Sequence, residues 1–329
     1  MPDRLRKIML RTIAATALLT LCGALHAAES AYPSKPIRVI VPFAPGGSTD
    51  ILIRTVGQKL TEQLGQSLVI DNRGGGGGAI GAALAAKSAP DGYTMMATTS
   101  GVIVVNPSLY RKLAYDPAAD FVPVTIIASL PNMLVLSPSV PVGSVKELIA
   151  MAKAKPGAMT YASGGNGTSN HLAGELLKFV AGVNLTHVPY KGGGPAVLAT
   201  MSGEVSMLFA TMPSAIPQVK AGKLKALAVT SRKRAEAMPE LPTMIEAGVK
   251  DFEVAIWIGV LAPRGTPAAY VGTLNAEIAR ALQSPQVATR LRAEGYDPVA
   301  NSPADMAAVI KTESAMWARV IKAAGINAD

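Results

Sequence analysis

The chain has 329 residues, of which 49% are hydrophobic but only 5% aromatic, and its formal net charge is +9. This length allows two domains of ordinary size, and the aliphatic composition fits an α/β protein with a core of Ala, Val, Leu, Ile and Met. Arg232–Arg234 is the only basic cluster and is predicted to be a solvated loop or helix start. Without a basic stripe or stacking aromatics, nucleic-acid binding is not expected.

Residues 1–27 have the pattern of a secretory signal peptide. Basic residues precede an apolar run from Ile13 to Leu25, and Ala27 is a small residue suited to cleavage. The run is too short to span a membrane comfortably. The single cysteine, Cys22, lies inside this segment and follows a leucine, whereas a lipoprotein site usually has a small residue there. We therefore expect cleavage near Ala27 and export to the bacterial periplasm as a chain without disulfides.

The first predicted strand, Ile37 to Val41, leads into a loop from Phe43 to Asp50 and then a helix whose apolar residues recur near the 3.6-residue period. Two glycines and two hydroxyl residues in this loop suit a tight turn at a helix start. The first N–H groups of a helix lack partners and favour negative charge, so such a loop can bind an anion. An ordinary strand-to-helix turn has the same composition. Asp50 could cap the helix or contact a ligand.

A second loop repeats the order of the first one about halfway along the chain. Val188 to Pro195 again reads Val, Pro, aromatic, two spacers, Gly, Gly, and it too follows an apolar run and precedes a helix. Pro195 suits an early helical position. Two similar glycine loops, one in each half, predict two α/β lobes that present matching loops to one cleft.

Further strands are predicted between these loops. Residues 67–70 and 93–98 read as strands of the first lobe, and Thr99 and Ser100 end the second of them. Ligands of parallel α/β sheets bind beyond the carboxyl ends of the strands, so these two residues are candidates for the pocket. Residues 121–129 and 133–136 read as two separate strands around Pro131, with the crossing into the second lobe between them.

The second lobe contains a third loop of glycine and hydroxyl residues. The strand at 159–162 opens into Ser163–Ser169, which precedes a helix with Leu172, Leu176, Phe179 and Val180 expected on one apolar side. Near the end of the chain, the apolar segment 252–261 suits the return crossing. One lobe is thus predicted to contain both chain ends, from residues 28–130 and 254–329, and the other to comprise residues 131–253.

Enzymatic and cofactor chemistry finds little support. Gly76, Gly78 and Gly81 satisfy the dinucleotide pattern, but the next strand does not end in the acidic residue that holds the ribose. An exported hydrolase using Ser163 or Ser169 with His171 is the alternative from another class. No cysteine and two histidines outside the expected signal peptide give no metal-ligand cluster. No catalytic residue, cofactor or metal is therefore expected.

Several stretches together resemble the Bug family, the substrate-binding receptors of tripartite tricarboxylate transporters. The likeness extends over essentially the whole chain after the expected signal peptide. The matching stretches are Pro42–Asp50, Pro90–Thr94, Asn106–Tyr110, Val188–Gly192, Ala221–Thr230 and Leu261–Pro267.

The resemblance implies a periplasmic binding protein-like (type II) fold of two α/β lobes with a ligand cleft between them. It also implies a small organic carboxylate as ligand, held by loops partly through ordered water, membrane components of the transporter as partners, and a monomer. A receptor that senses the ligand for a signalling partner uses the same fold. Two stretches depart from the family pattern, Gly74–Gly78 and Gly193–Gly194, and both are expected to widen or loosen the pocket.

The candidate ligand-binding residues lie in or beside the three loops and the third strand: Phe43, Pro45, Gly46, Gly47, Ser48, Thr49, Asp50, Thr99, Ser100, Ser163, Gly165, Asn166, Thr168, Ser169, His171, Tyr190, Lys191, Gly192 and Gly193. Apart from Asp50, His171 and Lys191, these residues are uncharged at neutral pH, so reversible capture by N–H and hydroxyl donors is the expected chemistry.

Overall fold

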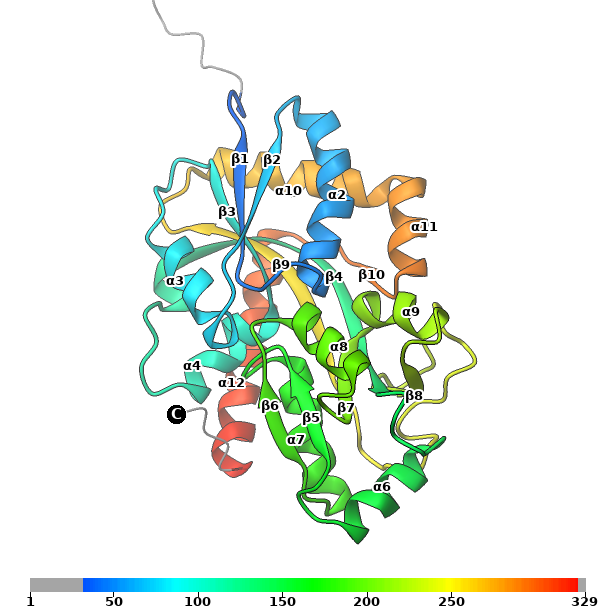
Figure 1. Ribbon diagram of the computed structural model, residues 1–329. Coiled ribbons are helices and arrows are strands. Elements are labelled where there is room, and N and C mark those ends of the chain that lie inside the picture. Colours follow the sequence, from blue (N-terminus) through cyan, green and yellow to red (C-terminus); the bar gives the residue numbers. More distant parts are fainter. Residues whose placement is uncertain (1–31, 325–329) are drawn as a thin grey trace, which may run out of the picture. The chain divides into compact units, whose positions relative to one another are not determined.

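Strand β1 (Ile37–Val41) lies inside the first part of the sheet, as its continuous apolar sequence predicts (Figure 1). It pairs in parallel with β2 (Leu68–Asn72) on one side and with β3 (Thr94–Thr99) on the other. The computed structural model describes residues 32–324, so the expected signal peptide lies outside the described residues. Within that range no helix is long and apolar enough to cross a membrane.

Strand β4 (Phe121–Leu136) is a single strand of 16 residues, so the prediction of two strands separated at Pro131 was wrong. Its first part pairs with β9 (Ala255–Pro263) up to the pair Pro131 and Ala255. From Asn132 onward it pairs with β7 (Met207–Thr211) and β8 (Lys225–Val229) instead. Proline lacks a backbone N–H, and here it stands where one partner strand ends and the next begins, so the strand continues through it.

The strands that pair with β4 beyond Pro131, and their neighbours, form the second part of the sheet, which is also parallel at its centre. Strand β5 (Thr160–Ser163) lies between β7 and β6 (Thr186–Pro189) and is parallel to both. The main path of strands is β2-β1-β3-β9-β4-β7-β5-β6, and the short β10 (Asp297–Pro298) also pairs with β4. Two apolar clusters fill the two faces of the second part, one around Tyr161 and Phe209, the other around Ala162 and Leu208.

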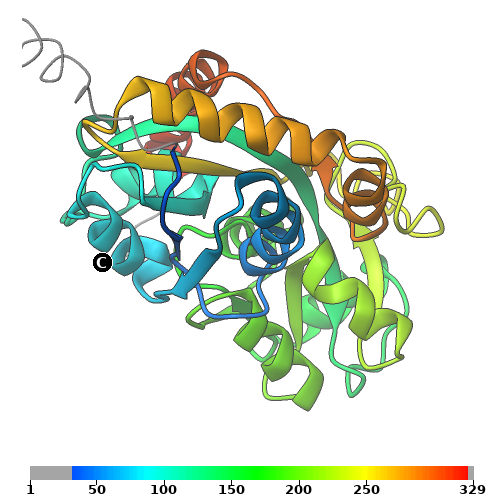
Figure 2. The same cartoon turned by 90° about the horizontal axis from the view of Figure 1, so that it is seen from above.

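Helices cover both parts of the sheet. Helix α10 runs along β4 and contacts α2 (Figure 2). The helices of the first part are α2 (Ser48–Leu64), α3 (Ala79–Ala86), α4 (Asn106–Leu109), α5 (Pro117–Asp120), α10 (Ala268–Gln283), α11 (Pro285–Ala293) and α12 (Pro303–Ala324), with short turns η1 (Gly76–Gly78) and η2 (Gly101–Val105). Those of the second part are α6 (Val145–Ala154), α7 (Ser169–Ala181), α8 (Gly193–Ser202) and α9 (Met212–Lys220).

Helix α7 packs on the core with only half of the predicted apolar side: Leu172 is buried and Leu176 is partly buried against the core, as predicted, but Phe179 and Val180 are not. Leu172, Ala173 and Leu177 are buried, whereas Phe179 is 82% exposed and Val180 37% exposed. The prediction extended the apolar side to the last turn of the helix, whereas its last buried residue is Leu177 and Gly182 ends the helix in the left-handed conformation.

Candidate functional site

A pocket lies where loops of the two parts of the sheet meet. Its empty space is about 390 Å³, including the part that is open to solvent, so the enclosed part is smaller. None of its lining side chains carries a charge. The lining residues are Phe43, Gly47, Ser48, Thr49, Thr99, Gly164, Thr168, Ser169, Asn170, Gly193, Thr211 and Ile256.

Four helices begin at this pocket. Ser48 and Thr49 open α2, Ser169 and Asn170 open α7, Gly193 opens α8, and Thr211 directly precedes α9. The first N–H groups of each helix have no partner within the helix. At none of these four starts does the side chain of the N-cap residue make a capping hydrogen bond. The pocket is therefore surrounded by backbone donors and by the positive ends of helix dipoles.

Asp50, a residue of α2 that is only 4% exposed, holds the loop that precedes this helix. Its carboxylate accepts a hydrogen bond from the Gly46 N–H at 3.0 Å and pairs with Arg54 at 2.9 Å. Burial opposes ionisation of Asp50, but the hydrogen bonds from Arg54 and Gly46 outweigh it and hold its pKa below the ordinary value. Gly46 has a φ of 81°, which favours glycine. One carboxylate oxygen of Asp50 thus holds the loop and the other pairs with Arg54 on α2, and Asp50 does not line the pocket.

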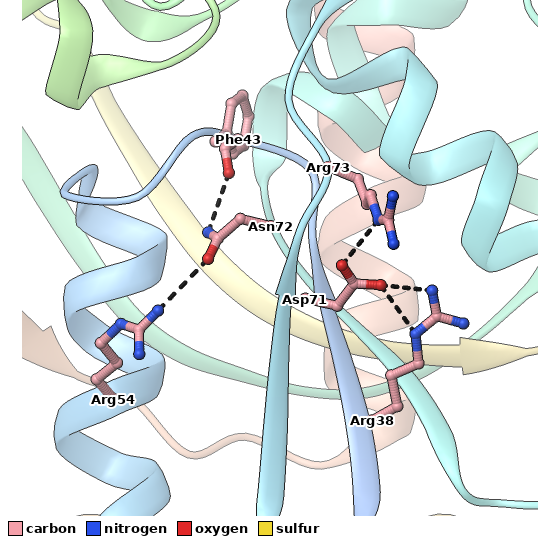
Figure 3. A network of polar contacts seen from close by, with 6 residues as sticks. All are labelled: Arg38, Phe43, Arg54, Asp71, Asn72 and Arg73. Atoms are coloured by element: carbon pink, nitrogen blue, oxygen red, sulfur yellow. Dashed lines mark hydrogen bonds and ion pairs between the residues drawn. The ribbon is translucent and has the colours of Figure 1, made fainter.

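A second group of polar residues fixes the same loop to β2 (Figure 3). The Asn72 side chain donates to the Phe43 carbonyl at 3.0 Å and accepts from Arg54 at 3.4 Å. The neighbouring Asp71 accepts from Arg73 at 2.7 Å and from Arg38. The loop that presents Phe43 and Gly47 is therefore anchored by side chains outside the pocket.

The loop before α7 is closed by its own hydroxyl groups and by a histidine. Ser163 Oγ accepts from the Gly165 N–H at 3.1 Å, and Thr168 Oγ1 donates to the Gly165 carbonyl at 2.7 Å. His171 Nδ1 accepts from the Gly167 N–H at 3.3 Å. At the end of the loop, Ser169 donates to the side chain of Asn132 on β4 at 3.1 Å.

The glycines that depart from the family pattern lie where opposing loops approach most closely. The Ala44 N–H donates to the Lys191 carbonyl at 2.9 Å. A Cβ atom at Gly74 would lie 2.7 Å from the Lys191 oxygen, one at Gly77 2.1 Å from the Asn166 oxygen, and one at Gly194 2.4 Å from the Pro45 oxygen. At these three positions glycine permits tight backbone contact beside the pocket. That the glycines also widen or loosen the pocket stays a prediction.

The structure brings eight of the candidate residues to the pocket wall and places the others behind it or beside it. Those on the wall are Phe43, Gly47, Ser48, Thr49, Thr99, Thr168, Ser169 and Gly193. Those outside it are Pro45, Gly46, Asp50, Ser100, Ser163, Gly165, Asn166, His171, Tyr190, Lys191 and Gly192. Tyr190, for example, donates its hydroxyl to Glu204 at 2.6 Å, and its ring packs against the core.

Four residues of the wall were missed in the sequence: Gly164, Asn170, Thr211 and Ile256. Thr211 had a detectable signal, because a Thr followed two residues later by Pro213 is typical of a helix start. The brace between Asp50 and Arg54 also follows the i, i+4 spacing of helical ion pairs. Ile256 lies on the crossing strand β9 and had no such signal.

The serine–histidine pair of the hydrolase alternative does not form. Ser163 Oγ lies 2.6 Å from His187 Nε2 rather than beside His171, and Ser163 is fully buried away from the pocket. Ser169 bonds to Asn132. A nucleophile must reach its substrate, and neither serine is activated at the pocket by an imidazole.

The two-lobed α/β fold with a donor-lined pocket between the lobes is that of a solute-binding protein of the periplasmic type II class. A family model described as the tripartite tricarboxylate transporter family receptor matches residues 52–326, and the chain belongs to this family.

Similar proteins agree with this assignment. The chain is 38% identical to the protein BugT of Bordetella pertussis, over 96% of this chain and 98% of that protein. Among solved structures, the periplasmic binding protein BugD is 35% identical with a TM-score of 0.87, over 90% of this chain and 99% of that one. Rpa4515 of R. palustris, solved with adipate, is 42% identical with a TM-score of 0.87 and the same coverage. MatC of Rhodopseudomonas palustris, solved with bound malate, is 33% identical with a TM-score of 0.83, over 88% and 100%.

Proposed function

We propose that this protein is a periplasmic receptor that captures a small aliphatic dicarboxylate between its lobes and delivers it to the membrane components of a tripartite tricarboxylate-type transporter. The observation that carries the proposal is the convergence of four helix N-termini, from both lobes, on one pocket without a charged side chain. The ligands of Rpa4515 and MatC, adipate and malate, are dicarboxylates and support this choice.

The donors around the pocket suit carboxylate oxygens. Each helix start offers N–H groups that have no partner within the helix and can donate to an anion. Among the described residues, the buried Thr49 Oγ1 has no hydrogen-bond partner, and it lies on the pocket wall. Phe43 and Ile256 supply apolar surface for a short hydrocarbon segment. Because a neutral site provides no fixed countercharge, the ligand is held by charge-assisted hydrogen bonds that remain reversible.

Capture would follow from closure of the lobes. We assign residues 28–130 and 254–329 to one lobe and 131–253 to the other, because the pairing of β4 changes partner between Pro131 and Asn132. Helix α2 belongs to the first lobe and α7, α8 and α9 to the second. A ligand with two carboxylates that bridges these helix starts favours the closed arrangement by its differential affinity for it.

A ligand panel tests this function. We expect adipate or malate, at about 100 times its Kd, to stabilise the protein by about 2.7 kcal/mol in a thermal unfolding experiment. Hexanoate is the matched control, because it keeps the hydrocarbon chain of adipate but lacks one carboxylate. If hexanoate stabilises the protein as strongly as adipate, the second carboxylate has no site. If no dicarboxylate of a broad panel stabilises it, the proposed function is wrong.

A further inference from the structure

Two imidazole rings lie side by side behind the loop that precedes α7. The ring centroids of His171, on α7, and His187, on β6, are 4.5 Å apart. The His187 ring also stacks on Tyr161 with a centroid distance of 4.8 Å. His171 is 6% exposed, and neither histidine lines the pocket. The pair is therefore placed to act on the loop rather than on the ligand.

Each ring holds a different point of this loop. The Gly167 N–H donates to His171 Nδ1 at 3.3 Å, so that nitrogen carries no proton. On the other ring, His187 Nε2 lies 2.6 Å from Ser163 Oγ, which itself accepts from the Gly165 N–H. The Ser163 hydroxyl can then donate its proton to His187 Nε2. With the His187 proton on Nδ1, both imidazoles act as neutral acceptors, one directly on Gly167 and one through Ser163 on Gly165.

The surroundings keep both rings neutral. Burial lowers the pKa of His171, and it lowers the pKa of His187 to about 4, with the neighbouring His171 acting in the same direction. Of the charged groups nearby, Lys178 also disfavours a protonated ring, while Glu175 favours one. However, the Glu175 carboxylate already accepts from the Tyr161 hydroxyl at 2.6 Å and from Lys178 at 2.9 Å.

We propose that His171 and His187 are positioning residues for the loop from Ser163 to Ser169. As neutral hydrogen-bond acceptors at two defined ring positions, they hold this loop in the geometry that presents the N-terminus of α7 to the pocket. This inference rests on the proposed function, because the loop matters only if α7 receives an anion. Loss of either acceptor lowers the fraction of molecules whose loop is in the binding geometry. The apparent affinity falls in proportion to that fraction.

Substitution by Asn or Gln can show whether the position of the acceptor atom matters for binding, rather than the size of the side chain. In His171→Asn the side-chain oxygen stands where Nδ1 was, and in His187→Gln the amide stands where Nε2 was. His171→Gln and His187→Asn are the matched controls, because they place the same amide group at the wrong ring position. By calorimetry with adipate at about neutral pH, we expect the first two variants to bind close to wild type and the two controls to bind about tenfold more weakly. Equal affinity within each matched pair would overturn the proposal.

A second measurement needs no ligand and separates failure of this inference from failure of the proposed function. Of the three histidines in the sequence only His171 and His187 lie among the described residues, so their imidazole NMR signals can be assigned with these variants. We expect the His187 ring to remain neutral at about pH 6 and the pKa of His171 to lie below its ordinary value. We also expect amide exchange at Gly167 to be faster in His171→Gln than in His171→Asn. A protonated His187 at that pH, or equal exchange in the two variants, refutes the positioning role whether or not adipate binds.

Discussion

Gly77 offers a sharp test of whether the close approach of the loops is required for binding. A Cβ at this position would lie 2.1 Å from the Asn166 oxygen and 2.9 Å from the Tyr110 hydroxyl. Real Cβ atoms essentially never approach an oxygen closer than 3.0 Å, so the two loops would have to separate by roughly an ångström in Gly77→Ala. In the lobe assignment proposed above, Gly77 belongs to the first lobe and Asn166 to the second, and the substitution would therefore oppose closure.

The φ angle of Gly77 is 58°, so alanine there also carries the strain of the left-handed conformation, about 1–2 kcal/mol. Gly65 is the matched control, because its φ is 63° and a Cβ there would meet nothing within 4 Å. Both variants should lose similar stability from backbone strain. Only Gly77→Ala should lose affinity in addition, by about 100-fold if the contact costs the closed state about 3 kcal/mol.

The assay is calorimetry with adipate together with thermal unfolding of the ligand-free protein for both variants. A Gly77→Ala protein that binds adipate as tightly as Gly65→Ala would refute the reasoning, because the loops could then separate without loss of binding. A fall in affinity equal in both variants would point to general loss of stability instead.

Four further predictions follow from single residues. Gly47→Val should weaken adipate binding about tenfold or more by calorimetry, whereas Gly47→Ala should bind nearly as wild type, because a Cβ there has only ordinary contacts at 3.6 Å and 3.8 Å. Because the pKa of Asp50 is lowered in the folded state, its contribution to stability is present above the unfolded-state pKa and is lost as pH falls through the folded-state pKa. Asp50→Asn should therefore make the stability less dependent on pH below about pH 4. An unchanged pH profile of unfolding contradicts this. Burial lowers the pKa of His187 from 6.5 to about 4, so the free energy of unfolding should decline as pH falls across that range. After allowance for the partial exposure of His187, the decline should be about 1–2 kcal/mol. In pH-dependent denaturation, His187→Gln should lack this decline. Leu177→Ala should lower stability by about 2–5 kcal/mol in urea unfolding and Phe179→Ala by less than about 0.5, and the reverse order would mean that α7 packs on its other face.

Much of the fold was predictable because its signals are local. The buried strand from Ile37 to Val41, the glycine loop after it and the start of α2 are adjacent in sequence, and each has its own composition signal. The same holds for the loop from Ser163 to Ser169 before α7. Continuity of β4 was not predictable, because the effect of Pro131 depends on where β9 ends and β7 begins, and these strands are distant in sequence.

The pocket residues divide in the same way, into those with a local sequence signal and those without one. Residues of the predicted loops reached its wall because the carboxyl ends of neighbouring parallel strands lie at one edge of the sheet. Which loop residues face the ligand space and which serve as braces depends on partners elsewhere: Asn72 for Phe43, Arg54 for Asp50 and His187 for Ser163. The pairs formed by Asn72 and His187 carry no signal in a single sequence. Asp50 and Arg54 have the i, i+4 spacing of a helical ion pair, but this spacing does not show whether Asp50 also contacts a ligand, so its role was left open.

The uninterrupted backbone of β4 has a consequence for motion. A chain segment that enters both lobes as a hydrogen-bonded ribbon, with β9 beside it, resists swivelling about a single bond and instead bends as an elastic strip. Opening of the proposed lobes would then be spread over several residues on either side of Pro131.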